Sequence, residues 1–144
     1  LQRAAALGAD ELVVGDDESN PVKTIREITG GRGVDIAIEA VGKPQTWEWA
    51  VNMVRRGGTV NFFGGCPNDS TVHLDTALLH YSEITCKASF HHTPAYVQKA
   101  LDLICAGHIT ASFFVNREEP LANLLEVMRH LMSHNGHLKT AILP

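Results

Sequence analysis

The chain has 144 residues, enough for one ordinary domain with a hydrophobic core. It carries 12 basic and 16 acidic residues and no basic run, and its net charge of −4 gives no electrostatic reason to expect nucleic acid or an anionic membrane as a partner. No apolar run approaches the roughly 20 residues of a membrane helix, and no charged-then-apolar leader opens the sequence, so we expect a soluble intracellular protein.

The first residues predict a helix followed by a buried strand. Residues 1–7 are strong helix formers that run into Gly8 with no capping residue ahead of them. We therefore expect the chain to begin inside a helix and to be a piece of a longer protein. The short apolar run at residues 11–14, bounded by Gly15, is typical of a buried parallel strand.

A helix and a second strand are predicted next. Asn20 and Pro21 supply an N-cap and a first-turn proline, apolar residues follow at helical spacing, and Gly30 stops the helix. Residues 34–40 alternate apolar side chains, and because Ala37 between them is also apolar, we expect both faces of this strand to be covered.

The following segments continue the alternation of helices and strands. An apolar helical stripe ends at Gly57 and Gly58, a third strand is predicted at residues 59–63, and a less regular segment at 73–81 leads to a fourth strand at 84–90. After Thr93 the pattern predicts a helix ended by Gly107, a segment at 112–115, a second helix and a last strand at 139–143. The apolar helical stripe that ends at Gly57 and Gly58 consists of Trp47, Ala50, Val51 and Val54.

This alternation predicts an α/β fold: a partial Rossmann-like doubly wound parallel sheet with helices on both faces, followed by C-terminal helices and a short strand. The carboxyl ends of parallel strands open on one crevice, and glycine there lets a ligand approach the main chain. Because the strands before Gly42 and Gly64 both end in this way, we expect a nucleotide or cofactor site.

The cysteines give no sign of a disulfide framework or a zinc knuckle. Cys66, Cys86 and Cys105 are odd in number and form no CxxC pair, so we expect reduced thiols in the cytoplasm.

Five strings in the chain resemble, in order, segments of the medium-chain dehydrogenase/reductase superfamily, particularly its zinc-dependent alcohol, polyol and threonine dehydrogenase group. They are LGADELVV, VDIAIEAVG, GGTVNFFGG, ITCKASFHH and HLKTAIL. The resemblance implies that residues 1–91 are the second half of a dinucleotide-binding domain whose first βαβ unit is missing, and that residues 92–144 return to the catalytic domain.

The resemblance places two strand ends against the dinucleotide. Val41 and Gly42 correspond to the turn on the adenosine side, although a simple strand-end turn explains Gly42 equally well. Gly64, Gly65 and Cys66 correspond to the strand end at the nicotinamide ring. A structural turn explains these glycines too, but two adjacent glycines at a crevice favour ligand approach.

Two further contacts with the cofactor follow from the same resemblance. The main chain of Ser89, Phe90 and His91 corresponds to the segment that binds the carboxamide, and Lys139 to a basic position on the pyrophosphate, where the alternative is a solvated lysine. Adjacent imidazoles at His91 and His92 suggest a metal or a proton relay, but neighbouring side chains on a strand point in opposite directions.

No metal or catalytic residue is assigned. His130, His134 and His137 have the spacing of a metal-binding helix face, but a solvated polar face explains them better. The GxGxxG turn and the acidic or basic residue that selects between NAD and NADP are absent from the sequence, so this choice and the substrate stay open.

The hypothesis is therefore the C-terminal cofactor-binding part of a zinc-type NAD(P)-dependent alcohol or polyol dehydrogenase, inactive alone and homo-oligomeric, as a dimer or tetramer, in its parent. The parent would transfer hydride between a secondary alcohol and nicotinamide, with zinc polarising the substrate oxygen. Two alternatives stay open: a zinc-free reductase of the same superfamily, and a non-catalytic binding module that self-associates through residues 59–63 and 112–115. An exposed apolar sheet edge is also expected to favour aggregation.

Overall fold

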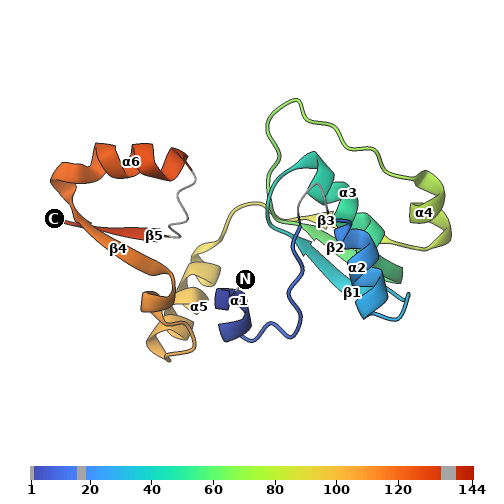
Figure 1. Cartoon of the computed structure of the whole chain (residues 1–144), viewed down its shortest axis with the longest axis horizontal. Helices are drawn as coiled ribbons and strands as arrows, with labels where there is room; N and C mark the ends of the chain where they lie inside the picture. Colours follow the sequence, from blue (N-terminus) through green and yellow to red (C-terminus); the bar gives the residue numbers. More distant parts are fainter. Residues whose placement is uncertain (1, 16–18, 134–138) are drawn as a thin grey trace. The chain divides into compact units, whose positions relative to one another are not determined.

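A computed structural model describes residues 2–15, 19–133 and 139–144 of the chain (Figure 1). The chain forms two compact units, Leu1–His91 and His92–Pro144. Within the described ranges, the helices are all too short or too polar to cross a bilayer.

The first unit contains a three-stranded parallel sheet in the order β1 (Val34–Glu39), β2 (Val54–Phe62) and β3 (Thr85–Ala88). Helix α3 (Pro44–Met53) joins β1 to β2, and α4 (Thr76–Tyr81) lies between β2 and β3 (Figure 1). The register pairs Glu39 with Phe62 and Phe62 with Ala88, so the three strands end at the same edge. The predicted α/β fold with a parallel sheet is confirmed.

The core of this unit lies on one face of the sheet. Val51 of α3 and Val60 of β2 are 1% and 0% exposed, and Leu78 and Leu79 of α4 pack against the same cluster. Both crossovers thus place their helices on one side, as right-handed connections do when strands are added in one direction.

The prediction that both faces of β1 are covered is wrong for this unit. Ile36 and Ile38 point away from the helices and are 64% and 67% exposed. A doubly wound sheet covers its second face with helices from strands added in the opposite direction. The described strands of this unit are all added in the same direction.

Helix α1 (Gln2–Ala6) and helix α2 (Pro21–Ile28) are confirmed, and Asn20 caps α2 by accepting a hydrogen bond from Lys23 N at 3.0 Å. The predicted strand at residues 11–14 is wrong, because this run is irregular. A strand needs a neighbour to satisfy its main-chain groups, and the sheet of this unit ends at β1 without pairing to this run.

Three predicted boundaries differ from those in the structure. Helix α3 ends at Met53 and β2 begins at Val54, so Gly57 and Gly58 lie inside the strand, where the register with β1 shifts. The irregular segment at 73–81 contains α4, which is capped by Asp75. Strand β3 stops at Ala88, earlier than predicted.

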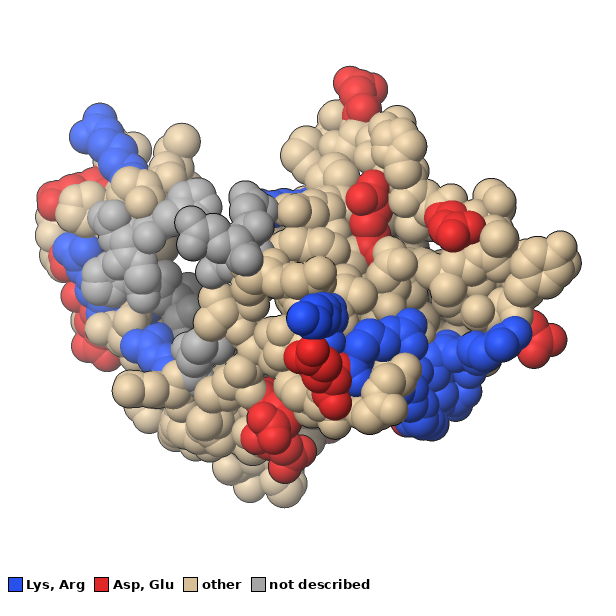
Figure 2. Space-filling view, turned by 45° about the vertical axis from the view of Figure 1, so that its right-hand side comes forward, with Lys and Arg blue, Asp and Glu red and all other residues tan. Residues whose placement is uncertain are grey.

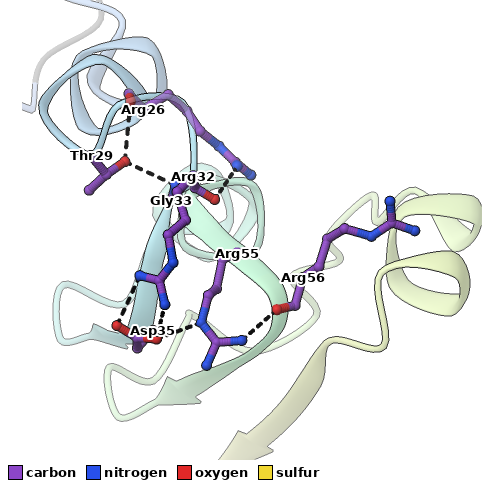
Figure 3. Close-up of polar contacts among 7 residues, drawn as sticks. All are labelled: Arg26, Thr29, Arg32, Gly33, Asp35, Arg55 and Arg56. Carbon is purple, nitrogen blue, oxygen red and sulfur yellow. Dashed lines mark hydrogen bonds and ion pairs between the residues drawn. The ribbon is translucent and has the colours of Figure 1, made fainter.

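Arginines gather near the amino-terminal ends of β1 and β2, where Figure 2 shows a basic surface on this unit. The Asp35 carboxylate accepts hydrogen bonds from Arg32 Nη2 at 2.6 Å and from Arg55 Nε at 2.5 Å, as drawn in Figure 3. Arg26 donates to Asn52 O and Val54 O, both at 2.9 Å, and so fastens α2 to the end of α3.

The second unit pairs two parallel strands, β4 (Val115–Pro120) and β5 (Lys139–Leu143). Helix α5 (Pro94–Cys105) is capped by Thr93, and the segment predicted at 112–115 divides between the 3-10 helix η1 (Ala111–Phe113) and the start of β4. The predicted second helix begins as a 3-10 turn, η2 (Leu121–Asn123), and continues as α6 (Leu124–Met132). The predicted final strand is confirmed.

Candidate functional site

Glu39, the last residue of β1, organises the turn that follows its strand. Its side chain is only 5% exposed. The Oε1 atom accepts hydrogen bonds from Val41 N and Gly42 N, both at 2.8 Å, and from Thr46 Oγ1 at 2.7 Å. One carboxylate oxygen therefore fixes the turn after β1 to the first turn of α3.

The ends of β1 and β2 pack directly on each other through two glycines. Gly42 has φ +82°, and a Cβ there would lie 2.5 Å from Gly65 O. A Cβ at Gly64 would lie 2.7 Å from Glu39 Oε2 and 2.8 Å from Val41 N. Contact between the two turns therefore requires glycine at 42 and 64, whether or not a ligand binds.

Gly65 differs from these two glycines because its surroundings are open. A Cβ at this position would meet nothing within 4 Å. Val41, in the turn after β1, is 67% exposed, and Cys66 is half-buried. The main chain from Gly65 to Cys66 is thus the part of the predicted site that a ligand can approach.

The end of β3 joins the same edge. Ser89 N donates to Phe62 O at 3.0 Å, and Ser89 Oγ lies 2.8 Å from Asn61 Oδ1. Phe90 is 87% exposed, its ring meets the His91 ring edge to face at 3.8 Å, and His91 has φ +62°. The structure therefore brings Gly42, Gly64 to Cys66 and Ser89 to one edge of the sheet, with Phe90 and His91 following directly.

The remaining predicted positions lie in the second unit. Lys139 starts β5 opposite Val115, and its contact with a pyrophosphate stays a prediction. His130 Nδ1 lies 3.4 Å from Arg117 Nη1, whereas His134 and His137 fall outside the described residues. Among residues 2–15, 19–133 and 139–144, no three His, Cys, Asp or Glu side chains gather to hold a metal ion.

The electrostatics of the site centre on Glu39. Burial raises the pKa of Glu39, but hydrogen bonds from Thr46, Gly42 and Val41, with the nearby Trp47 indole, outweigh this and hold the pKa below its ordinary value. Glu39 is therefore ionised at neutral pH. Burial, and then the negative charge of Glu39, raise the pKa of the Cys66 thiol.

Sequence reasoning missed Glu39. The available signal was an acidic residue that ends an apolar strand immediately before a glycine turn, where burial of a charge requires several donors.

A family model described as zinc-binding dehydrogenase matches residues 1–106, and the chain belongs to this family. The sorbitol dehydrogenase of Bacillus subtilis (strain 168) is 28% identical over 145 residues, which cover 100% of this chain and 40% of that protein. Alcohol dehydrogenase 2 of Caenorhabditis elegans is 34% identical over 125 residues, covering 85% of this chain and 34% of that protein.

Solved structures agree with this assignment. The alcohol dehydrogenase TADH from Thermus sp. ATN1 superposes with a TM-score of 0.86 and 28% identity, covering 100% of this chain and 41% of that chain. The chain thus spans about 40% of the length of this structure and of the sorbitol dehydrogenase it matches. The resemblance predicted from the five sequence segments is confirmed.

Proposed function

We propose that the chain is the C-terminal cofactor-binding part of a zinc-type NAD(P)-dependent dehydrogenase that transfers hydride between a secondary alcohol, or a polyol, and nicotinamide. The observation that carries the proposal is the in-register ending of β1, β2 and β3 at one edge, with open main chain at Gly65. Cofactors bind at this position in open α/β sheets. Family membership supplies the chemistry.

In this proposal each strand end meets a different part of the dinucleotide. Val41 and Gly42 face the adenosine side, and Gly64 to Cys66 lie at the nicotinamide ring. The main chain of Ser89 to His91 binds the carboxamide, and Lys139 neutralises the pyrophosphate. When bound, the nicotinamide supplies the hydride acceptor or donor, and the protein supplies its orientation.

In this proposal the two units have different roles. Residues 1–91 hold the cofactor, and residues 92–144 return to the catalytic domain of the parent protein. The described residues offer no fitting set of zinc ligands, so no zinc role is assigned to them. A cytoplasmic location and a homo-oligomeric parent acting on a small-molecule alcohol belong to the same proposal.

Titration of the purified chain with NAD⁺, NADH, NADP⁺ and NADPH tests the proposal. We expect the dinucleotide to bind, and Gly65→Leu to weaken binding about tenfold, because the new side chain occupies the approach to the main chain. Ser70→Leu, in an exposed loop, is the matched control and retains wild-type affinity. No binding by the wild type, or equal binding by Gly65→Leu, would contradict the proposal.

Activity of the isolated chain is a separate test. We expect no alcohol oxidation or carbonyl reduction by the purified chain, since no catalytic residue is assigned to it. Cofactor-dependent turnover that co-purifies with the chain through several columns would show that the chain carries its own catalytic groups.

A further inference from the structure

Glu39 is a buried carboxylate with no cationic partner among the residues that the structure describes. None of the ion pairs formed by the described residues includes Glu39. Three donors satisfy Oε1, but no donor in the described part of the chain makes a hydrogen bond to Oε2. A negative charge that is buried and not paired acts strongly on its surroundings, because little water screens it.

The free oxygen of this carboxylate lies beneath the end of β2. Oε2 is 2.7 Å from the position that a Cβ of Gly64 would occupy. Its charge also acts on Cys66, because burial and then this carboxylate raise the pKa of the Cys66 thiol. The field of Glu39 therefore acts on Gly64 to Cys66.

The orientation of the charge is fixed. Oε1 is held by donors from the following turn and from α3, and Gly64 N and Phe63 N donate to Glu39 O at 2.9 Å and 2.8 Å. The side chain consequently cannot turn away when a ligand arrives, so its field is preorganised.

We propose that Glu39 makes the site favour the oxidised, positively charged nicotinamide ring relative to the reduced, neutral ring. This inference rests on the proposed function, which puts the ring at Gly64 to Cys66. The carboxylate attracts the cationic ring through space and has no comparable effect on the neutral ring. Glu39 acts as a specificity determinant without touching the reacting atoms.

The test is the ratio of the dissociation constants for NAD⁺ and NADH, measured by calorimetric titration of the full chain, with NADP⁺ and NADPH in parallel. Glu39→Gln keeps the shape of the side chain and removes its charge. We expect it to raise the ratio Kd(NAD⁺)/Kd(NADH) roughly three- to tenfold, the effect of one charge at about 1 nm in a partly screened site.

Two controls separate charge from structure. Glu83→Gln makes the same change at an exposed residue before the amino-terminal end of β3, and we expect it to leave the ratio unchanged. Glu39→Asp keeps the charge and shortens the side chain, so it weakens both cofactor forms but retains a ratio close to wild type. A purely structural role for Glu39 would weaken both forms equally in Glu39→Gln as well.

The outcomes are distinct. An unchanged ratio in Glu39→Gln, or an equal shift in Glu83→Gln, overturns the inference and leaves the proposed function intact. A wild-type chain that binds neither form overturns the proposed function, and the inference with it. If Glu39→Gln does not fold, a second pair of variants replaces it. Thr46→Lys places a cation against Glu39, and the neutral Thr46→Met is its control. Equal values of Kd(NAD⁺)/Kd(NADH) in these two variants overturn the inference.

Discussion

The indole ring of Trp47 lies nearly parallel to the phenyl ring of Phe62, with 3.9 Å between the centroids and 10° between the planes. Trp47 belongs to α3 and Phe62 ends β2, so this contact closes the helix onto the sheet. Trp47 Nε1 also donates to Gly64 O at 2.9 Å. A single side chain therefore packs against the core and anchors the turn that carries the open main chain.

Truncation of this side chain is expected to destabilise the first unit. Trp47→Ala should lower the free energy of unfolding by about 3 kcal/mol, since it removes a large packed aromatic ring. Trp47→Phe keeps most of the ring contact and loses the hydrogen bond, so about 1 kcal/mol is expected. Urea denaturation followed by far-ultraviolet circular dichroism measures both. Equal losses would show that the hydrogen bond, not packing, dominates.

The glycines of the site are expected to tolerate alanine very differently. Gly42→Ala combines a left-handed φ of +82° with a Cβ only 2.5 Å from Gly65 O, so we expect a loss of about 3 kcal/mol or more. Gly30→Ala has φ +61° and open surroundings, and about 1 kcal/mol is expected from the backbone alone. Gly65→Ala should change stability by less than about 0.5 kcal/mol. The same denaturation experiment ranks the three, and an equal loss at 42 and 30 would contradict the packing argument.

Local signals in the sequence predict most of the secondary structure. Asn20 with Pro21 is a capping signal that depends only on neighbouring residues, and it is confirmed. The run at residues 11–14 has the composition of a strand, yet a strand also needs a partner, which lies beyond what a local pattern contains. Local composition therefore predicts that a segment can form a strand, but not whether it finds a neighbouring strand to pair with.

In the candidate site, too, the sequence predicts the local features but not those that depend on strand pairing. Glycines after two apolar strands predict a crevice, and the structure brings Gly42 and Gly64 together as expected. Their packing depends on the register that pairs Glu39 with Phe62, and so does the burial of the Glu39 carboxylate. Register is set by contacts between distant segments, so neither the burial of Glu39 nor the openness of Gly65 follows from the sequence pattern.

Acid is expected to weaken the first unit through Asp35. Hydrogen bonds from Arg32 and then Arg55 hold the pKa of Asp35 far below its ordinary value of 3.8. Because the folded-state pKa is depressed, the stabilisation is present above about pH 4 and is lost as the pH falls through the lower folded-state value. Urea midpoints measured from pH 6 down to pH 2 should show a shallower acid dependence in Asp35→Asn than in the wild type.

The control for the acid experiment is added salt, because the ion pairs of Asp35 are exposed to solvent. The side chains of Arg32 and Asp35 are 56% and 58% exposed, so salt should screen their interaction. In about 1 M salt the difference between wild type and Asp35→Asn should shrink. A difference that persists undiminished at high salt would point to a mechanism other than charge pairing at the surface.

The charge of Glu39 can also be detected without any cofactor, through the reactivity of Cys66. Burial and the charge of Glu39 raise the pKa of this thiol, and the thiolate is the nucleophile in alkylation. In a background carrying Cys86→Ser and Cys105→Ser, Glu39→Gln should therefore increase the rate of alkylation by iodoacetamide at pH 7.5 roughly two- to fivefold. Glu83→Gln in the same background should leave the rate unchanged. Mass spectrometry of timed samples measures the rate. Equal rates in the background protein and its Glu39→Gln variant would mean that the field of this carboxylate does not reach the end of β2, where the proposal needs it.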